Sequence, residues 1–233
     1  MNDFDLIVVG AGPGGYEAAL HAAKLGLKTA VVERREVGGT CLNRGCIPTK
    51  ALLHASTVYE ETKNGPALGV TAENLSYDLS AMFAYKQQVV EKLRSGIESL
   101  FKAAKVTLLR GTGTLSAPNT VTVAGENEGV YTAQNILLAT GSVPARPPIP
   151  GLDLPGVMTS DELLSGEGGD FSSLVIIGGG VIGMEFATFY NDLGVAVTVV
   201  EGLDRLLPNM DRELGQCISE CQCGKDCNCD CQK

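Results

Sequence analysis

The first 33 residues constrain the fold of this chain more than any other stretch. Residues 4–10 are a short apolar run rich in β-branched side chains, which is typical of a buried parallel strand. The glycine-rich run Gly10–Gly15 follows directly and predicts a tight turn that opens a helix over residues 16–25. A second strand is expected over residues 28–32 and ends at the acid Glu33. This order of elements predicts a βαβ unit.

The residue types at this turn suit a bound dinucleotide. Glycines permit the tight turn and let the backbone approach a pyrophosphate, while the helix N-terminus offers unpaired N–H groups and a positive dipole end. An acid at the end of the second strand is placed to hydrogen-bond a ribose hydroxyl. The predicted binding residues are Gly10, Gly12, Gly14, Gly15 and Glu33.

The same pattern returns in the second half of the chain. A strand is expected over residues 173–177, a helix over 184–193 and a strand over 196–200, which ends at Glu201. A second glycine turn lies between the first strand and the helix, and it contributes Gly178, Gly180 and Gly183 as candidate binding residues. The acid favours the free 2′-hydroxyl of NAD over the 2′-phosphate of NADP.

Two cysteines, Cys41 and Cys46, lie five positions apart in a run that enters a helix. Positions i and i+5 of a regular helix point well apart, whereas a disulfide requires Cα atoms about 4.4–6.8 Å apart. The helix must therefore be distorted if the pair bridges, and Gly45 and Pro48 fall where this distortion is needed. The alternative interpretation is a pair of buried structural thiols.

The run from Gly38 to Lys50, Gly-Gly-Thr-Cys-Leu-Asn-Arg-Gly-Cys-Ile-Pro-Thr-Lys, resembles the active-site segment of the flavin-dependent pyridine nucleotide–disulfide oxidoreductases. Within that family, the segment is most similar to the dihydrolipoamide dehydrogenase branch at Leu42, at Ile47 and at Ala51-Leu52-Leu53, which follows Lys50. The resemblance implies FAD at the first glycine turn and NAD at the second. It implies hydride transfer between NAD and FAD, and electron transfer between FAD and the cysteine pair.

The resemblance also assigns roles to the two thiols. It implies that Cys41 exchanges with the dithiol substrate and that Cys46 faces the flavin as the charge-transfer thiolate. A helix N-terminus and the nearby Lys50 lead us to expect lowered thiol pKa values.

Further cofactor contacts follow from the resemblance alone. Lys50 is expected near the flavin ring, Gly113 at the FAD adenine, and Thr140 and Gly141 against the flavin nucleotide. Glu185, in the second predicted helix, is expected to approach the flavin. Without the resemblance, Lys50 and Glu185 are ordinary polar helix residues, and Gly113 is a glycine at a bend.

The remaining segments carry no chemistry of their own. We expect a loop over residues 65–77, a long amphipathic helix over 80–105 packed on the sheet, and strands over 106–115, 120–123 and 131–138. The run Gly111-Thr112-Gly113 interrupts the first of these strands. His21 and His54 are expected to be structural.

These elements predict an α/β chain with two Rossmann-like dinucleotide-binding units. The expected divisions are an FAD-binding domain with the redox helix (1–143), a proline-rich linker (144–150), a partial NAD-binding domain (151–215) and a cysteine-rich tail (216–233). The resemblance stops near residue 215, so we expect the C-terminal part of the family fold to be missing. That part carries the catalytic base and the homodimer interface of the family, and we therefore expect incomplete catalysis from this chain alone.

The tail is rich in thiols and poor in apolar residues, so it cannot form a core. Its cysteines are Cys217, Cys221, Cys223, Cys227, Cys229 and Cys231. This density resembles a metallothionein, and soft thiolates favour Zn(II) or Cu(I). The alternatives are an altered gene end or an unstructured thiol-rich terminus.

Composition excludes several classes of partner. A net charge of −9 argues against nucleic acid or an anionic membrane, and no stretch is apolar and long enough to span a bilayer. The N-terminus leads directly into a strand, so we expect no secretory signal peptide and a cytoplasmic location. The expected partner is a dihydrolipoamide-type dithiol, either free or on a lipoyl carrier protein. The alternatives are a mercuric or glutathione reductase-like enzyme, or a non-catalytic flavin- or metal-binding fragment.

Overall fold

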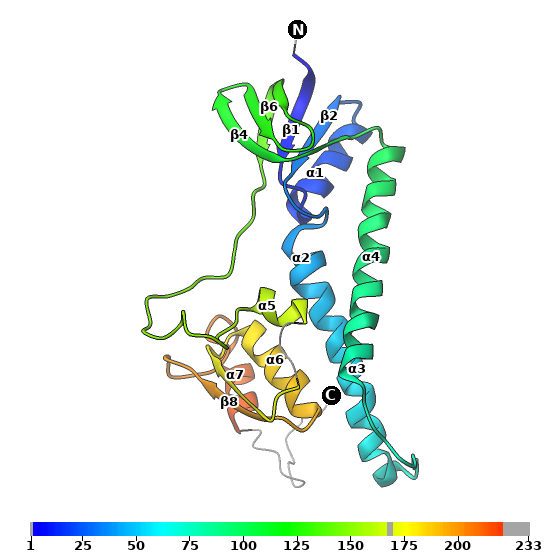
Figure 1. The fold of residues 1–233 in the computed structure, drawn as a ribbon, viewed down its shortest axis with the longest axis vertical. Helices are drawn as coiled ribbons and strands as arrows, with labels where there is room; N and C mark the ends of the chain where they lie inside the picture. The colour runs from blue at the N-terminus through cyan, green and yellow to red at the C-terminus, as the bar shows by residue number, and fades with distance from the viewer. Residues whose placement is uncertain (1, 167–169, 221–233) are drawn as a thin grey trace. The chain divides into compact units, whose positions relative to one another are not determined.

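The computed structural model describes residues 2–166 and 170–220. The chain divides into two compact units, and each is described by itself (Figure 1). Unit 1 contains residues 1–51 and 83–167, and unit 2 contains residues 52–82 and 168–233. Two of the three boundaries between the units fall within helices, namely α3 (Cys46–Asn64) and α4 (Leu79–Ala103).

Unit 1 is built on one six-stranded sheet with the strand order β3-β2-β1-β6-β5-β4. Its strands are β1 (Phe4–Val9), β2 (Thr29–Glu33), β3 (Thr107–Arg110), β4 (Thr112–Ala117), β5 (Thr120–Ala124) and β6 (Gly129–Leu138). The four strands β3, β2, β1 and β6 are parallel, whereas β6, β5 and β4 form an antiparallel meander. The predicted α/β class is confirmed.

Alternation along the central strands decides which side chains face which layer. Val8 and Val31 belong to a core cluster with residues of α1 (Pro13–Lys24) and α4, among them the buried Phe101. Their neighbours along the strands, such as Ile7 and Val32, belong to a second cluster with residues of the meander. Because side chains of a strand alternate between the two faces, helices cover one face and the meander covers the other.

The long amphipathic helix predicted over residues 80–105 is confirmed as α4. Its buried residues include Val90, Ile97 and Phe101, which fall at helical spacings on one face. Burying a side chain of the size of Phe101 contributes about 1.5–3 kcal/mol. Packing against the sheet therefore stabilises the segment of α4 that belongs to unit 1.

Local residues decide where α1 and β4 begin. Helix α1 begins at Pro13 rather than at residue 16, because Gly12 is its N-cap and proline suits the first helical position. The interruption expected at Gly111-Thr112-Gly113 is present, because the segment over residues 106–115 is divided into β3 and β4 at Gly111, whose φ is 154°. A side chain there would lie 2.7 Å from the carbonyl oxygen of Ala124. Gly111 thus lets the chain leave the parallel sheet and enter the meander.

Unit 2 contains the parallel pair β7 (Ser173–Ile177) and β8 (Ala196–Val200) with the helices α6 (Val181–Asp192) and α7 (Arg212–Glu220). Phe186, Phe189 and Tyr190 of α6 are buried. A 3-10 helix (Gly65–Leu68) lies within the segment that was expected to be a loop. Ser56 donates a hydrogen bond to Asp192 at 2.7 Å, and this contact ties residues of α3 to α6 inside the unit. In the described part of the chain, no helix is both long and apolar enough to cross a membrane.

Candidate dinucleotide and dithiol site

The first glycine turn is shaped by close backbone approaches. Gly10 has φ of 103°, donates its N–H to the carbonyl of Val32 at 2.8 Å, and would place a Cβ 2.2 Å from the carbonyl oxygen of Ala139. A Cβ at Gly15 would lie 1.9 Å from the Gly10 oxygen. Neither position accepts a side chain, so α1 starts close against the end of β1 with its N–H groups at the turn.

The carboxylate of Glu33 supports this turn. It accepts hydrogen bonds from the N–H groups of Ala11 at 2.8 Å and Arg35 at 2.7 Å. The carbonyl of Ala11 in turn accepts a hydrogen bond from Gly38 at 2.8 Å. Ala11 is fully buried and therefore links the acid at the end of β2 to the segment that leads into the cysteines.

The other residues predicted near the flavin nucleotide are placed as follows. Ala139 donates its N–H to Val9 at 2.8 Å, and the Cα of Thr140 would lie 3.3 Å from a Cβ on Gly10. Thr140 is therefore beside the glycine turn, and Gly141 follows with φ of 68°. Gly113 lies within β4 rather than at a bend, and a Cβ there would press on Val32 at 3.0 Å.

The cysteine segment begins directly on the glycine turn. Helix α2 (Gly39–Arg44) has Gly38 as its N-cap, and both Gly38 and Gly39 have positive φ, 98° and 60°. A Cβ on Gly39 would lie 2.5 Å from the Cα of Gly12. Because of this close approach, α2 begins at the glycine turn. Cys41, in the first turn of α2, therefore follows the predicted pyrophosphate site directly.

The predicted distortion of the cysteine helix is present. The helix is interrupted at Gly45, which has φ of −148° and ψ of −117°, and α3 starts at Cys46. Pro48 cannot donate a helical hydrogen bond to Arg44, so α2 does not continue into α3. Thr49 donates both its N–H and its hydroxyl to the Gly45 carbonyl, at 3.1 and 2.7 Å, which stabilises the interruption.

Both cysteines are thiols in this structure, Cys46 exposed and Cys41 partly buried. Burial raises the pKa of Cys41 above its usual range, and the neighbouring Cys46 thiol raises this pKa further, while Lys50 lowers it to a smaller extent. The expectation of a lowered thiol pKa was therefore wrong for Cys41. Desolvation of the thiolate outweighs the helix N-terminus and Lys50.

Unit 2 repeats the geometry of the first turn. Gly178 has φ of 105° and donates its N–H to Val200 at 2.8 Å, and a Cβ on Gly183 would lie 2.3 Å from the Gly178 oxygen. Gly180 is the N-cap of α6. The Glu201 carboxylate accepts hydrogen bonds from Gly179 at 2.7 Å and from Leu203 at 2.9 Å.

These hydrogen bonds also set the charge state of the acid. The hydrogen bonds from Leu203 and Gly179 lower the pKa of Glu201 below its usual range, so the group is a carboxylate at neutral pH. An open depression of about 510 Å³ adjoins it, lined by Glu201, Leu203, Asp204, Arg205, Leu206, Arg212 and Gln216. Unit 2 therefore presents an anionic acceptor beside a surface hollow at the end of β8.

The remaining predicted residues are less informative. Lys50 is exposed on α3, one turn after Cys46, and Glu185 lies on α6. Cys217 lies on α7, and the other five tail cysteines, Cys221, Cys223, Cys227, Cys229 and Cys231, lie outside the described residues. Among residues 2–166 and 170–220 there is no group of three or more His, Cys, Asp or Glu side chains that could hold a metal ion.

Sequence reasoning did not identify the side chains that hold the cysteine segment. Arg44, between the two thiols, forms an ion pair with Glu36 at 2.7 Å and lies 3.6 Å from Asp161. Arg94 donates a hydrogen bond to Asn43 at 3.0 Å. The one sequence signal for Asn43 and Arg44 is their position between the two cysteines. Their partners Arg94 and Asp161 lie far away in the sequence, so local patterns do not predict these contacts.

The described residues thus combine two dinucleotide-type glycine turns, and the first turn adjoins the helical segment that carries the thiol pair. The chain belongs to the pyridine nucleotide-disulphide oxidoreductase family, whose model matches residues 4–230. This confirms the family resemblance found in the sequence.

Several proteins of known sequence or structure are similar to this chain over most of its length. The chain is 42% identical over 222 residues to a dihydrolipoyl dehydrogenase of Chlamydia pneumoniae and 41% identical over 226 residues to one of Bacillus subtilis. These alignments cover 93% and 92% of this chain and 47% of each relative. The solved Cu(II) complex of the HOCl-induced flavoprotein disulfide reductase RclA from Escherichia coli matches with a TM-score of 0.79 and 29% identity, over 94% of this chain and 47% of that chain. The chain thus spans about half the length of the relatives it matches.

Proposed function

We propose that this chain forms the FAD- and thiol-bearing part of a disulfide oxidoreductase that passes electrons from a dithiol substrate through Cys41 and Cys46 to FAD and then to NAD. The observation that carries the proposal is the close approach of Gly39 to Gly12, where a Cβ on Gly39 would lie 2.5 Å from the Cα of Gly12. Because of this contact, the thiol-bearing helix begins on the turn at which the first dinucleotide would bind.

The residues of unit 1 fit FAD. The proposed contacts are Gly10, Gly12, Gly14, Gly15, Glu33, Lys50, Gly113, Thr140 and Gly141. The N-terminus of α1 is open to a pyrophosphate, and the Glu33 carboxylate retains acceptor sites for a ribose hydroxyl beyond the two N–H groups it binds. When bound, FAD would supply the two-electron link between the thiol pair and NAD.

The chain's own chemistry is thiol–disulfide exchange. In the oxidised protein Cys41 and Cys46 share a disulfide, and a dithiol substrate reduces it through a mixed disulfide with Cys41. The substrate becomes a cyclic disulfide, the two cysteines gain two electrons, and the two substrate protons balance the two new thiols. Burial favours the protonated form of Cys41, so this residue would release a proton when the disulfide forms again.

Unit 2 would hold NAD. Gly178, Gly180 and Gly183 form the second turn, and Glu201 is a fixed carboxylate that can accept from the ribose 2′-hydroxyl and repel a 2′-phosphate. Glu185 of α6 is proposed to approach the flavin. The acid supports NAD over NADP, which separates this proposal from glutathione and mercuric reductase-like alternatives.

The relatives named dihydrolipoyl dehydrogenase support dihydrolipoamide, free or on a lipoyl carrier protein, as the substrate. A homodimer and a cytoplasmic location belong to the same proposal. The rival proposal is a flavin-binding fragment without turnover.

The purified chain should be examined by visible spectroscopy for oxidised flavin and then mixed anaerobically with dihydrolipoamide. We expect bound FAD that is bleached by the dithiol. The Cys41→Ser/Cys46→Ser variant is the matched control and should keep FAD while losing the bleaching. FAD retained without bleaching in the wild type would favour the rival proposal, and a colourless protein would refute FAD binding by this chain.

The tail supports a second, separate proposal, namely binding of Zn(II) or Cu(I) by its thiolates. The observation that favours it is six cysteines between positions 217 and 231. Cys217 is disulfide-bonded in the structure, so metal binding by this residue would require the reduced chain. Native mass spectrometry of the reduced protein with added Zn(II) tests the idea, and an unchanged apo mass would end it.

A further inference from the structure

The two residues before the helix break are both held by side-chain contacts from elsewhere in unit 1. Asn43 donates hydrogen bonds to the carbonyls of Val37 at 3.0 Å and Gly39 at 2.9 Å. The side-chain oxygen of Asn43, Oδ1, accepts a hydrogen bond from Arg94 of α4 at 3.0 Å. The end of α2, between the thiols, is therefore attached to the residues at the start of α2 and to α4.

Arg44 makes the second attachment. Its Nη1 contacts Glu36 Oε2 at 2.7 Å, and its Nε lies 3.6 Å from Asp161 Oδ2 of α5 (Ser160–Ser165). The Arg44 side chain is only 18% exposed. The other oxygen of Asp161 is buried and has no hydrogen-bond partner among the described residues, so Arg44 provides the counter-charge of this carboxylate.

The position of Arg44 gives these contacts a consequence for the thiols. Arg44 is the last residue of α2, and the helical hydrogen-bond ladder is interrupted at the next residue, Gly45. The thiols lie on opposite sides of this interruption. A disulfide tolerates only a narrow range of Cα–Cα distances, so motion of α2 relative to the start of α3 would lower the effective concentration of one thiol at the other.

We propose that Arg44 is a positioning residue for the Cys41–Cys46 pair, and that it acts through its bridge from Glu36 to Asp161. It does not act as a charge on the thiol, since the cation that lowers the pKa of Cys41 is Lys50. The inference rests on the proposed redox role of the pair and adds the device that holds its geometry.

The test is the equilibrium with dithiothreitol, which needs neither FAD nor NAD. Reduced dithiothreitol gives two electrons and two protons to the Cys41–Cys46 disulfide and becomes its own cyclic disulfide, and the protein gains two thiols. The fraction of disulfide is measured by acid quenching, alkylation and mass spectrometry of the peptide that contains both cysteines. This readout reports the thiol geometry rather than turnover.

Arg44→Met should favour the dithiol form, with an equilibrium constant for disulfide formation about tenfold lower than in the wild type. For a two-electron couple this corresponds to a reduction potential about 30 mV more positive. Arg44→Lys keeps one cationic contact and should give an intermediate value. Asp161→Asn and Glu36→Gln should each shift the equilibrium in the same direction by less than Arg44→Met.

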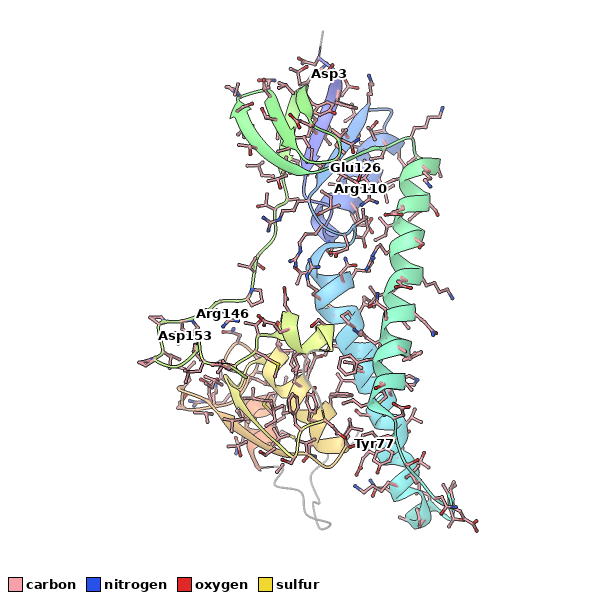
Figure 2. The ribbon with its side chains drawn as sticks, viewed as in Figure 1. Asp3, Tyr77, Arg110, Glu126, Arg146 and Asp153 are labelled. Carbon is pink, nitrogen blue, oxygen red and sulfur yellow. The ribbon has the colours of Figure 1, made fainter. Side chains whose placement is uncertain are left out.

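Arg110→Met is the matched control. Arg110 forms an ion pair with Glu98 at 2.6 Å, is partly exposed, and lies at the end of β3 (Figure 2). Its loss removes a comparable surface contact of unit 1 without changing a residue between the two cysteines or a partner of Arg44. We expect the dithiothreitol equilibrium of this variant to match the wild type, whatever the change in thermal stability.

The outcomes separate the inference from the proposed function. A wild-type chain that forms no Cys41–Cys46 disulfide at any dithiothreitol ratio would refute the redox role itself. A wild type that does form it, with a folded Arg44→Met within twofold of it, would overturn the positioning role alone. If Arg44→Met does not fold, Arg44→Lys and Asp161→Asn decide the question, and wild-type values for both would overturn the inference.

Discussion

The Glu201 carboxylate accepts a hydrogen bond from the Gly179 backbone amide at 2.7 Å, and Glu33 accepts one from Ala11 at 2.8 Å in the corresponding place of the first turn. In both units the acid at the end of the second strand thus holds the glycine turn through a backbone N–H of the turn. A charge-assisted hydrogen bond of this kind is stronger than a neutral one. The turn is therefore preorganised by the same carboxylate that is proposed to bind the ribose.

The helix–strand approach at Gly15 should be intolerant of substitution. Gly15→Ala would place a methyl group 1.9 Å from the Gly10 oxygen, and we expect destabilisation of about 1–3 kcal/mol and loss of bound FAD. Thermal unfolding monitored by circular dichroism and the flavin content measure the two effects. Gly14→Ala is the matched control for stability, because a Cβ there meets nothing within 4 Å. Equal melting temperatures for the two variants would contradict the packing argument.

The ionisation of Glu201 should appear in the pH dependence of stability. Its folded-state pKa lies below the ordinary value of 4.5, so its contribution is present above that pH and is lost as the pH falls through the folded value. The difference in melting temperature between wild type and Glu201→Gln should be constant above about pH 5.5 and should shrink below about pH 4. A difference in melting temperature that grows as the pH falls would show that folding does not lower the pKa of Glu201.

The same variant tests the nucleotide preference. Glu201→Gln retains an acceptor for Gly179 but loses the negative charge that disfavours a 2′-phosphate. We expect NAD to bind more weakly and the ratio of NADP to NAD affinity to rise by about tenfold, the size of a typical charge-assisted contact. Isothermal titration with each nucleotide provides the measurement, and an unchanged ratio would remove Glu201 from the specificity argument.

Cys41 should behave as a thiol with a high pKa. Its alkylation by iodoacetamide should be slow at neutral pH and should accelerate only above the ordinary thiol value of 9.0. Cys46→Ser removes the neighbouring thiol that raises this pKa and should move the midpoint of the rate profile to lower pH. Lys50→Met should move it to higher pH, because Lys50 lowers the pKa. A fast reaction of wild-type Cys41 at pH 7 would instead restore the expectation of an activated thiolate.

Lys86 is a buried cation on α4 that supports α5 inside unit 1. Its Nζ donates a hydrogen bond to the carbonyl of Leu164 at 2.7 Å and lies 5.1 Å from the centre of the Phe83 ring. Lys86→Met should destabilise the protein by about 1–3 kcal/mol, since the Leu164 carbonyl loses its donor. Lys92→Met, at an exposed position of the same helix, is the control in thermal unfolding and should have little effect.

The lowered pKa of Lys86 fixes the direction in which its contribution to protein stability changes with pH. Burial lowers its pKa below 10.5, so between the two values the unfolded state binds more protons than the folded state. Wild-type stability should therefore gain a contribution as the pH rises toward about 10.5, and Lys86→Met should lack that gain. Parallel pH profiles of the two proteins would show that Lys86 is not desolvated.

Local sequence patterns were sufficient for the two βαβ units. The predicted strands over residues 173–177 and 196–200 coincide with β7 and β8, and the interruption expected near Gly45 and Pro48 is present. These features depend on short-range causes. Glycine permits a close backbone approach or a positive φ, proline removes a donor, and an apolar β-branched run favours a strand.

Other features depend on residues that meet only after folding. The sequence predicts Gly113 as a cofactor contact or a bend, but it does not predict the close approach to Val32, because that approach arises when the meander covers the sheet. Local sequence patterns likewise do not predict how the segments group into units. Residues 52–82 belong with 168–233, and residues 83–167 belong with the N-terminal segment.

The sequence by itself determined where the dinucleotide turns and the thiol pair lie, because glycine spacing and two cysteines on one segment are local properties of the chain. Only the tertiary structure decided that Arg44 would bridge Glu36 and Asp161, and that Cys41 would be buried enough for its pKa to rise. Ion pairing and desolvation depend on distance and burial, and these exist only once segments far apart in the sequence have been brought together.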